Sequence, residues 1–383
     1  MSSFFNSLQQ YATPLFTLAF GGALVARAEE PIMDQTSDSS ARYKPTPVDV
    51  IVVRIMLEKA TKLPPELLDL MFDQAEYWPH SESTFHRPYT NPRDCFCVIG
   101  GSSAENKLVL RCPPIGFVDY HKVGEAFKTA TLPPKLADGS AAIEPMGHLT
   151  NMEHVQSPSA PTREAGREYF EGSMSQPPAL IHPVRKIVFK LRSRDQGWGG
   201  AHGDRGTYRH SWTWFEAGLE KFDEDRQCDE ACKVSPQNPT AESDDGSRSP
   251  TSNLCTCGLQ SIHPPIVELP NGALAYHHHV HADDNLKIQC NKTATRDWAE
   301  HEVVWSWEDD ILPDSLDADR LEEVGRGRGT GTGRFVRNLK LGDVVTVWGK
   351  ARFGGWANYV ESVKYDNCWC WIAPDTPSSE MPT

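Results

Sequence analysis

The stretch that decides the fold is FVRNLKLGDVVTVWGKARFGGWANYVESVKYDNCWCW, residues 335–371. Short runs of alternating apolar and polar residues are separated in it by Gly and Asp, which is typical of strands joined by turns. The stretch predicts strands at 335–339, 344–352, 356–365 and 368–372. Similar runs upstream predict further strands near 187–191, 211–215 and 303–307. Short strands without long helices indicate a mainly β fold, an antiparallel β-sandwich.

Length and charge narrow the class of protein. The chain has 383 residues, enough for two domains or for one domain with long tails. Its 52 acidic residues outnumber 38 basic ones, a formal net charge of −14. This argues against nucleic-acid binding, because nucleic-acid binders need a basic face. The apolar run at 14–25 is too short for a bilayer-spanning helix, so we expect no integral membrane span.

The cysteine content bears on the compartment. Ten cysteines in 383 residues are far fewer than a disulfide scaffold carries, so we expect reduced thiols in a cytoplasmic or nuclear protein. The alternative is a secreted protein, because Ala26-Arg27-Ala28 ends the apolar run and resembles a signal cleavage site.

The predicted organisation has five parts. They are a tail at 1–44, a helical element with a short β-hairpin at 45–125, a disordered linker at 126–180, the sandwich at 181–373 with a disordered insertion at about 223–258, and a tail at 374–383. Apolar residues three or four apart predict a first helix from about 48. A second helix is predicted to begin near Pro64-Pro65, because Pro is tolerated in a first helical turn.

A histidine cluster, Tyr276-His277-His278-His279-Val280-His281-Ala282-Asp283-Asp284, offers ligands for a metal. On a strand, His277, His279 and His281 would share a face, and three imidazoles suffice for a catalytic zinc with an open position. Zn or Fe bound there would make the chain a metal-dependent jelly-roll enzyme. The alternative is a solvated, His-rich loop.

Two further stretches have ligand-like spacing. Cys228, Cys232, Cys255 and Cys257 flank the acidic insertion and offer four thiolates for zinc, or are surface cysteines. Residues 325–333, GRGRGTGTG, contain G-x-G repeats but precede a strand, whereas a Rossmann loop follows one. We therefore expect a flexible loop there.

The polar motifs LRSRDQGWGG at 191–200 and RFGGWAN at 352–358 both leave a strand into a Gly-rich turn. Arg, amide and Trp side chains at a sandwich end suit a sugar or a peptide loop. The predicted ligand-binding residues are Arg192, Arg194, Asp195, Gln196, Trp198, Arg352, Trp356 and Asn358. The alternative is that the Trp residues fill the core and the Arg residues stack on them or pair with Asp195.

Catalytic motifs are missing from the sequence. It has no G-x-S-x-G elbow, no P-loop and no H-E-x-x-H, and no nucleophile–base set stands out. We therefore expect a binding protein rather than an enzyme.

The segment Leu63-Pro64-Pro65-Glu66-Leu67-Leu68 resembles the L-P-x-E-L-L start of an F-box helix. In that family the helix docks on a ubiquitin-ligase adaptor of the Skp class. The resemblance implies such a partner, bound by Leu63, Pro64, Leu67 and Leu68. The later F-box helices would fall within 78–120, where Pro, Cys and strand patterns stand instead.

The motifs SRDQGWGG, SWTWFE and VTVWGKARFGGWAN resemble a fungal family of uncharacterised proteins, some of them labelled ankyrin-repeat proteins. This chain lacks the T-P-L-H pattern of ankyrin repeats, and the family implies no reaction. The strand pattern is also similar to galactose-binding-like and phloem-lectin-like sandwiches, which follow F-boxes in some plant and animal proteins. Together the resemblances imply a substrate-recognition adaptor of a ubiquitin ligase with a glycan or peptide ligand.

Overall fold

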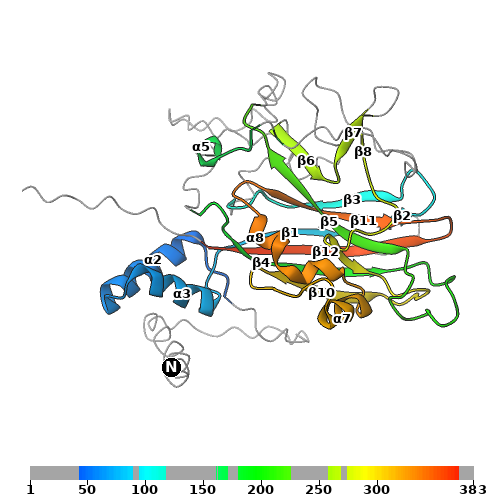
Figure 1. The fold of residues 1–383 in the computed structure, drawn as a ribbon, viewed down its shortest axis with the longest axis horizontal. Coiled ribbons are helices and arrows are strands. Elements are labelled where there is room, and N and C mark those ends of the chain that lie inside the picture. Colours follow the sequence, from blue (N-terminus) through cyan, green and yellow to red (C-terminus); the bar gives the residue numbers. More distant parts are fainter. Residues whose placement is uncertain are drawn as a thin grey trace, which may run out of the picture. The chain divides into compact units, whose positions relative to one another are not determined.

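A computed structural model describes residues 43–88, 95–117, 161, 163–170, 180–225, 258–268 and 274–370. Within these ranges the fold is mainly β, with two antiparallel five-stranded sheets, a two-stranded ribbon and short helices (Figure 1). The predicted antiparallel sandwich is therefore confirmed, whereas its galactose-binding-like type stays a prediction.

The first sheet is built around one long strand, β12 (Ala357–Trp369). On one side β12 pairs with β4 (Val184–Arg194), which in turn pairs with β10 (Ala299–Ser306). On its other side it pairs first with β2 (Phe96–Ile99) and then with β1 (His80–His86). The two strands predicted after residue 356 are thus one continuous strand.

The second sheet faces the first and is centred on β11. Its strands, in spatial order, are β3 (Asn106–Arg111), β11 (Val344–Ala351), β5 (Thr213–Phe222) and β6 (Leu259–His263), and β9 (Lys287–Cys290) also pairs with β5. A separate ribbon joins β7 (Ile266–Glu268) to β8 (Leu274–Tyr276). Because β1, β2 and β3 belong to the two sheets, the sandwich extends beyond the predicted boundary of 181–373.

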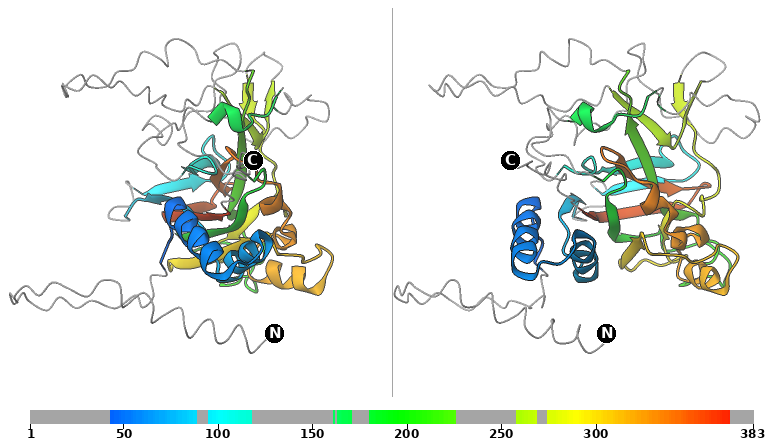
Figure 2. Two further views of the ribbon diagram at one scale, coloured as in Figure 1. Left: turned by 90° about the vertical axis from the view of Figure 1, so that its left-hand side faces the viewer. Right: turned by 60° about the vertical axis from the view of Figure 1, so that its left-hand side comes forward.

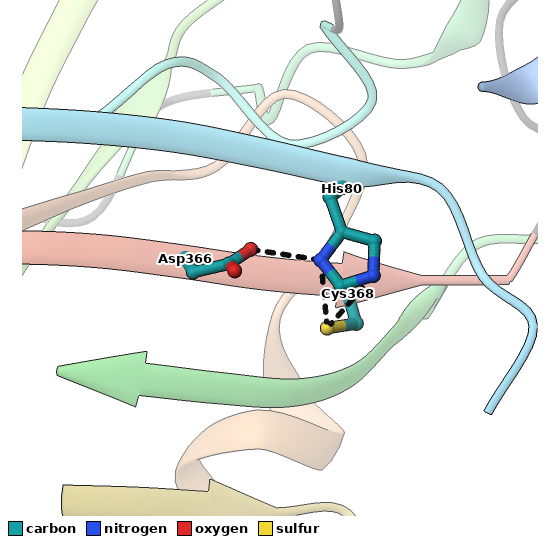
Figure 3. A group of neighbouring side chains, drawn as sticks. All are labelled: His80, Asp366 and Cys368. Carbon is teal, nitrogen blue, oxygen red and sulfur yellow. Dashed lines mark hydrogen bonds and ion pairs between the residues drawn. The ribbon is translucent and has the colours of Figure 1, made fainter. Parts of the chain in front are cut away.

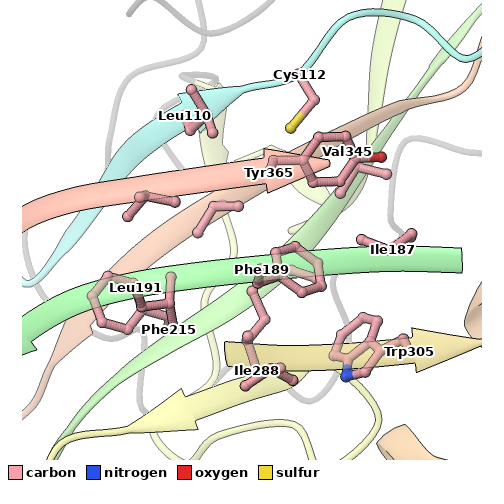
Figure 4. Close-up of a cluster of buried hydrophobic side chains, with 14 of the residues drawn as sticks. Leu110, Cys112, Ile187, Phe189, Leu191, Phe215, Ile288, Trp305, Val345 and Tyr365 are labelled. Carbon is pink, nitrogen blue, oxygen red and sulfur yellow. The ribbon is translucent and has the colours of Figure 1, made fainter. Parts of the chain in front are cut away.

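The main core lies between the two sheets (Figure 4). Ile187, Phe189 and Leu191 of β4 alternate with outward-facing residues and are buried, as the sequence pattern predicted. Trp305 of β10 packs edge-on against Phe189, with ring centroids 5.0 Å apart. Each such side chain stabilises the fold by about 1.5–3 kcal/mol relative to an exposed one.

Two helices form the N-terminal element, as predicted. Helix α2 (Pro47–Thr61) begins with a capping box, and α3 (Pro65–Ala75) begins with Pro in its first turn. They pack at the end of β12 (Figure 2). Val50, Phe72 and Trp369 form a small core there. None of the helices in the described ranges is long and apolar enough to cross a bilayer.

The predicted strand at 335–339 is wrong, because this segment is helix α8 (Arg334–Asn338). Val336 and Leu339 are both buried in the main core, and their spacing of three residues suits a helix rather than a strand. Helix α7 (Leu316–Glu323), which the sequence patterns did not predict, lies just before it.

The predicted flexible Gly-rich loop is also wrong. Residues Arg328–Thr332 form the 3₁₀ helix η2, and all three glycines at 327–331 lie against other parts of the fold. A Cβ atom on Gly327 would lie 2.2 Å from the carbonyl oxygen of Asp284. These glycines are therefore required by close packing.

The predicted linker at 126–180 contains a packed segment. Helix α5 (Arg167–Phe170) places Phe170 in a second core with Phe117 and Phe222. Residues 126–160, 162 and 171–179 of that linker lie outside the described residues. The same holds for the signal-like segment, most of the predicted insertion with its four cysteines, and the C-terminal tail.

Candidate binding site at one end of the sandwich

Asp195 fixes the turn that follows β4. Its buried carboxylate accepts hydrogen bonds from the backbone N–H groups of Gly197 (2.7 Å), Ala294 (2.6 Å) and Thr295 (2.9 Å). Burial raises the pKa of Asp195, and these three bonds partly oppose the rise. The turn is thereby tied to a loop almost one hundred residues further along the chain.

Gln196 joins the two Gly-rich turns that the sequence singled out. Its Oε1 accepts a hydrogen bond from the backbone N–H of Ala357 (3.0 Å), and its Nε2 donates to the carbonyl oxygen of Trp198 (2.7 Å). Trp198 is 57% exposed and lies against Gly355. A Cβ at Gly355 would be 2.9 Å from the indole, and its φ of +96° also favours glycine. The turns therefore hold an exposed indole in one place.

Arg192 and Arg194 lie on the outer surface of the first sheet beside this turn. The Arg194 guanidinium stacks over the rings of Tyr359 (4.6 Å) and Trp298 (5.1 Å). Arg192 forms ion pairs with Glu361 and with a second glutamate on β10. Neighbouring side chains thus hold both arginines, but through glutamates, Tyr359 and Trp298 rather than through Asp195.

Three of the eight predicted ligand residues, Asp195, Arg352 and Asn358, are buried, so direct ligand contact by them is a wrong prediction. Arg352 Nη2 donates to the carbonyl oxygen of His279 (2.7 Å), and its guanidinium lies 5.0 Å from the Trp214 ring. Asn358 Nδ2 donates to the Trp214 carbonyl oxygen (3.1 Å). They position the turns. The predicted residues that reach the surface wholly or in part are Arg192, Arg194, Gln196, Trp198 and Trp356.

A cavity of about 920 Å³ lies close to these turns. Tyr208 and Trp212 from the loop before β5 line it together with His281, and Asp319 and Glu322 of α7 supply carboxylates. Its volume is within the range of small-ligand sites. The sequence patterns did not indicate this cavity, because they did not predict α7.

Phe353 connects the cavity to the Trp198 turn. Its ring meets Trp212 edge-on, with centroids 4.5 Å apart, and it lies two residues before Gly355. Phe353 is exposed and has φ of 62°, an unusual backbone conformation for a bulky residue. Such strain occurs preferentially at functional sites. We call Trp198, Phe353, Trp212 and the adjoining cavity the aromatic end.

The histidine cluster does not lie on a strand, because β8 ends at Tyr276. The rings of His277 and His279 meet edge-on, with centroids 5.0 Å apart, but His281 packs against Trp212 (5.6 Å). The shared face on which the predicted metal site depended is therefore absent, and that part of the prediction is wrong. The arrangement matches the alternative of a loop.

His278 anchors this loop from inside the protein. It is buried, and its Nδ1 lies 2.7 Å from the Nζ of the buried Lys350. Burial lowers the pKa of His278 well below its ordinary value and lowers that of Lys350 to about 8.

A different group has metal-ligand spacing among the described residues. It consists of His80, Asp366 and Cys368, whose ligand atoms all lie within 4.8 Å of one another. Burial raises the pKa of the Cys368 thiol to about 12, so the thiol is protonated at neutral pH in the absence of a cation.

Comparisons of the chain with protein-family models, with curated proteins and with solved structures found no match. The function is therefore inferred from the geometry of the sites.

Proposed function

We propose that this chain is a non-enzymatic binding protein whose aromatic end holds a glycan or a peptide. The observation that carries the proposal is the exposure of Trp198 on a turn that the buried Asp195 carboxylate fixes. A rigid, exposed ring loses little conformational freedom when a ligand stacks on it. The neighbouring cavity adds the rings of Tyr208 and Trp212 and the carboxylates of α7.

A glycan array and a displayed peptide library test this proposal with the full chain as probe. Trp198→Ala and Trp212→Ala are expected to lose the ligands that the wild type binds. Tyr43→Ala removes an exposed aromatic ring outside the aromatic end and is expected to bind normally. Unchanged binding by both tryptophan variants would contradict a ligand site at this end.

We further propose that the helix pair recruits a Skp-class adaptor, which would make the chain a substrate-recognition subunit of a ubiquitin ligase. The L-P-x-E-L-L resemblance supports it, and so do the exposed apolar side chains Val52 and Met56 on α2 and Leu67 and Leu70 on α3. Leu68, which the resemblance also assigned to the partner, is fully buried, so its predicted contact with the partner is wrong.

Direct binding to a purified Skp-class adaptor tests this second proposal. The Leu67→Ala/Leu70→Ala variant is expected to bind at least about tenfold more weakly than the wild type, since each leucine would bury apolar surface at the contact. Leu312→Ala, an exposed leucine elsewhere, serves as the control. The proposal fails if the wild type does not bind the adaptor at micromolar concentrations, or if the double variant binds equally well.

A further inference from the structure

We propose that His80, Asp366 and Cys368 form a binding site for Zn²⁺ on the outer face of the first sheet (Figure 3). The strand register brings the three residues together. His80, the first residue of β1, lies directly opposite Cys368 on β12. Asp366 is two residues before Cys368 on the same strand, so both side chains leave the same face.

The distances between the ligand atoms are close to those of a zinc centre. His80 Nδ1 lies 2.9 Å from Asp366 Oδ1 and 3.4 Å from Cys368 Sγ. In a tetrahedral zinc site with ordinary bond lengths, these separations are about 3.4 Å and about 3.6 Å. The ligand atoms of Asp366 and Cys368 lie within 4.8 Å of each other, so the three side chains would draw together around the ion. One nitrogen, one oxygen and one sulfur are all ligand types that Zn²⁺ accepts.

Lys44 supplies the outer support that metal ligands usually have. Its Nζ donates to Asp366 Oδ2 (2.5 Å), while Oδ1 of the same carboxylate faces His80. A cation bound through Oδ1 therefore leaves the lysine contact in place, and Lys44 keeps the carboxylate oriented. Lys44 also pairs with Glu82 on β1.

The site is partly open to solvent. The side chains of His80 and Asp366 are 18% and 13% exposed, whereas Cys368 packs under Trp78. Three protein ligands leave a fourth position for water. Binding would form a bond from Zn²⁺ to the sulfur and release the thiol proton to solvent. The ion would join β1, which follows the helix pair, to β12.

Metal content and cobalt absorption of the full-length protein test the site. After loading with Zn²⁺ and removal of excess metal, the wild type is expected to hold one equivalent more than Cys368→Ser or His80→Ala. Co²⁺ in place of zinc is expected to give a near-ultraviolet thiolate-to-metal band that Cys368→Ser lacks. Lys44→Ala is expected to weaken the affinity by about 10-fold, as loss of an outer support does.

Two controls and one conservative ligand variant make the result specific. Cys97→Ser removes a thiol on β2, and His279→Ala removes a histidine of the 277–281 loop, and both are expected to keep the full metal content. Asp366→Asn keeps the size of the side chain, so it reports on the site if the other variants fold poorly in near-ultraviolet circular dichroism. Equal zinc content in the wild type, Cys368→Ser and Asp366→Asn overturns the proposal.

Discussion

Replacing Trp198 by alanine tests whether this residue is an exposed ligand platform or part of the core. The two roles differ in how much surface the ring buries in the folded protein. Trp198 is 57% exposed, while Trp305 is 1% exposed in the main core. Trp305→Ala is therefore the matched reference for the loss of a core tryptophan. Binding by Trp198→Ala is expected to be lost, as argued above.

The size of the stability loss follows from the buried area. With less than half of its surface buried, Trp198 hides about 100 Å² of the roughly 250 Å² that a large aromatic side chain can bury. At about 25 cal/mol per Å² this is at most about 2.5 kcal/mol, and less if the unfolded chain is compact. Trp305→Ala is expected to cost about 3–5 kcal/mol, because it also leaves a cavity.

Thermal and urea unfolding of the two variants, followed by circular dichroism, gives the comparison. A loss of about 1 kcal/mol in the free energy of unfolding lowers the thermal midpoint by about 2–4 °C in a domain of about 150–250 residues. The Trp198→Ala shift is expected to be clearly smaller, at most about one half to four fifths of the Trp305→Ala shift. Equal shifts would refute the reasoning, because Trp198 would then be a core residue rather than an exposed platform.

Two other predictions concern buried charges. Burial raises the pKa of Asp343 to about 7, so the folded state keeps a proton that the unfolded chain loses from about pH 4 upward. Asp343 therefore lowers the free energy of unfolding increasingly as the pH rises through this window, by about 4 kcal/mol above pH 7. Asp343→Asn is expected to raise the thermal midpoint more at pH 8 than at pH 5, and an equal gain at both would contradict this. Arg111 and Glu220 form a buried two-bond pair (2.8 and 2.9 Å), so Arg111→Met is expected to cost about 3–5 kcal/mol in urea unfolding. Adding Glu220→Leu is expected to restore most of the loss, and a double variant no more stable than the single one would argue against an uncompensated charge.

The alternation of apolar and polar residues predicted the buried strands well, because the buried face of a strand and the turns beside it depend on nearby residues in the sequence. The same rule failed at 335–339, since five residues are too few to distinguish a period of 2 from a period of 3.6. Helix α8 forms there because Gly333 adopts φ of 66° just before it and because a helix buries both Val336 and Leu339. Strand β1 was missed because its sequence, HSESTFH, has one large apolar residue and lies at a sheet edge.

The sequence likewise predicted some features of the candidate binding site and not others. The motifs at 191–200 and 352–358 were predicted to lie together, and the bond from Ala357 to Gln196 brings them into contact. Both Asp195 and Trp198 were predicted to contact a ligand because of their side-chain chemistry. Asp195 is buried, however, and Trp198 is exposed. Sequence could not show this, because the loop that covers Asp195 comes from residues 294 and 295. His80 and Cys368 are 288 residues apart, so only the strand register reveals their contact.

Strand β12 joins the two regions proposed to bind a ligand and an adaptor, which lie at its opposite ends. Its first residue, Ala357, contacts the Trp198 turn through Gln196, and its last residue, Trp369, packs on the helix pair. At about 3.3 Å per residue the two ends are roughly 40 Å apart. A ligand at the aromatic end and an adaptor on α3 would therefore not collide. Because β12 is hydrogen-bonded to neighbouring strands on both sides, we expect it to stay in place when either partner binds. We expect a ternary complex in which the affinity for each partner is the same whether or not the other is bound. A tenfold change in either affinity would mean that β12 moves.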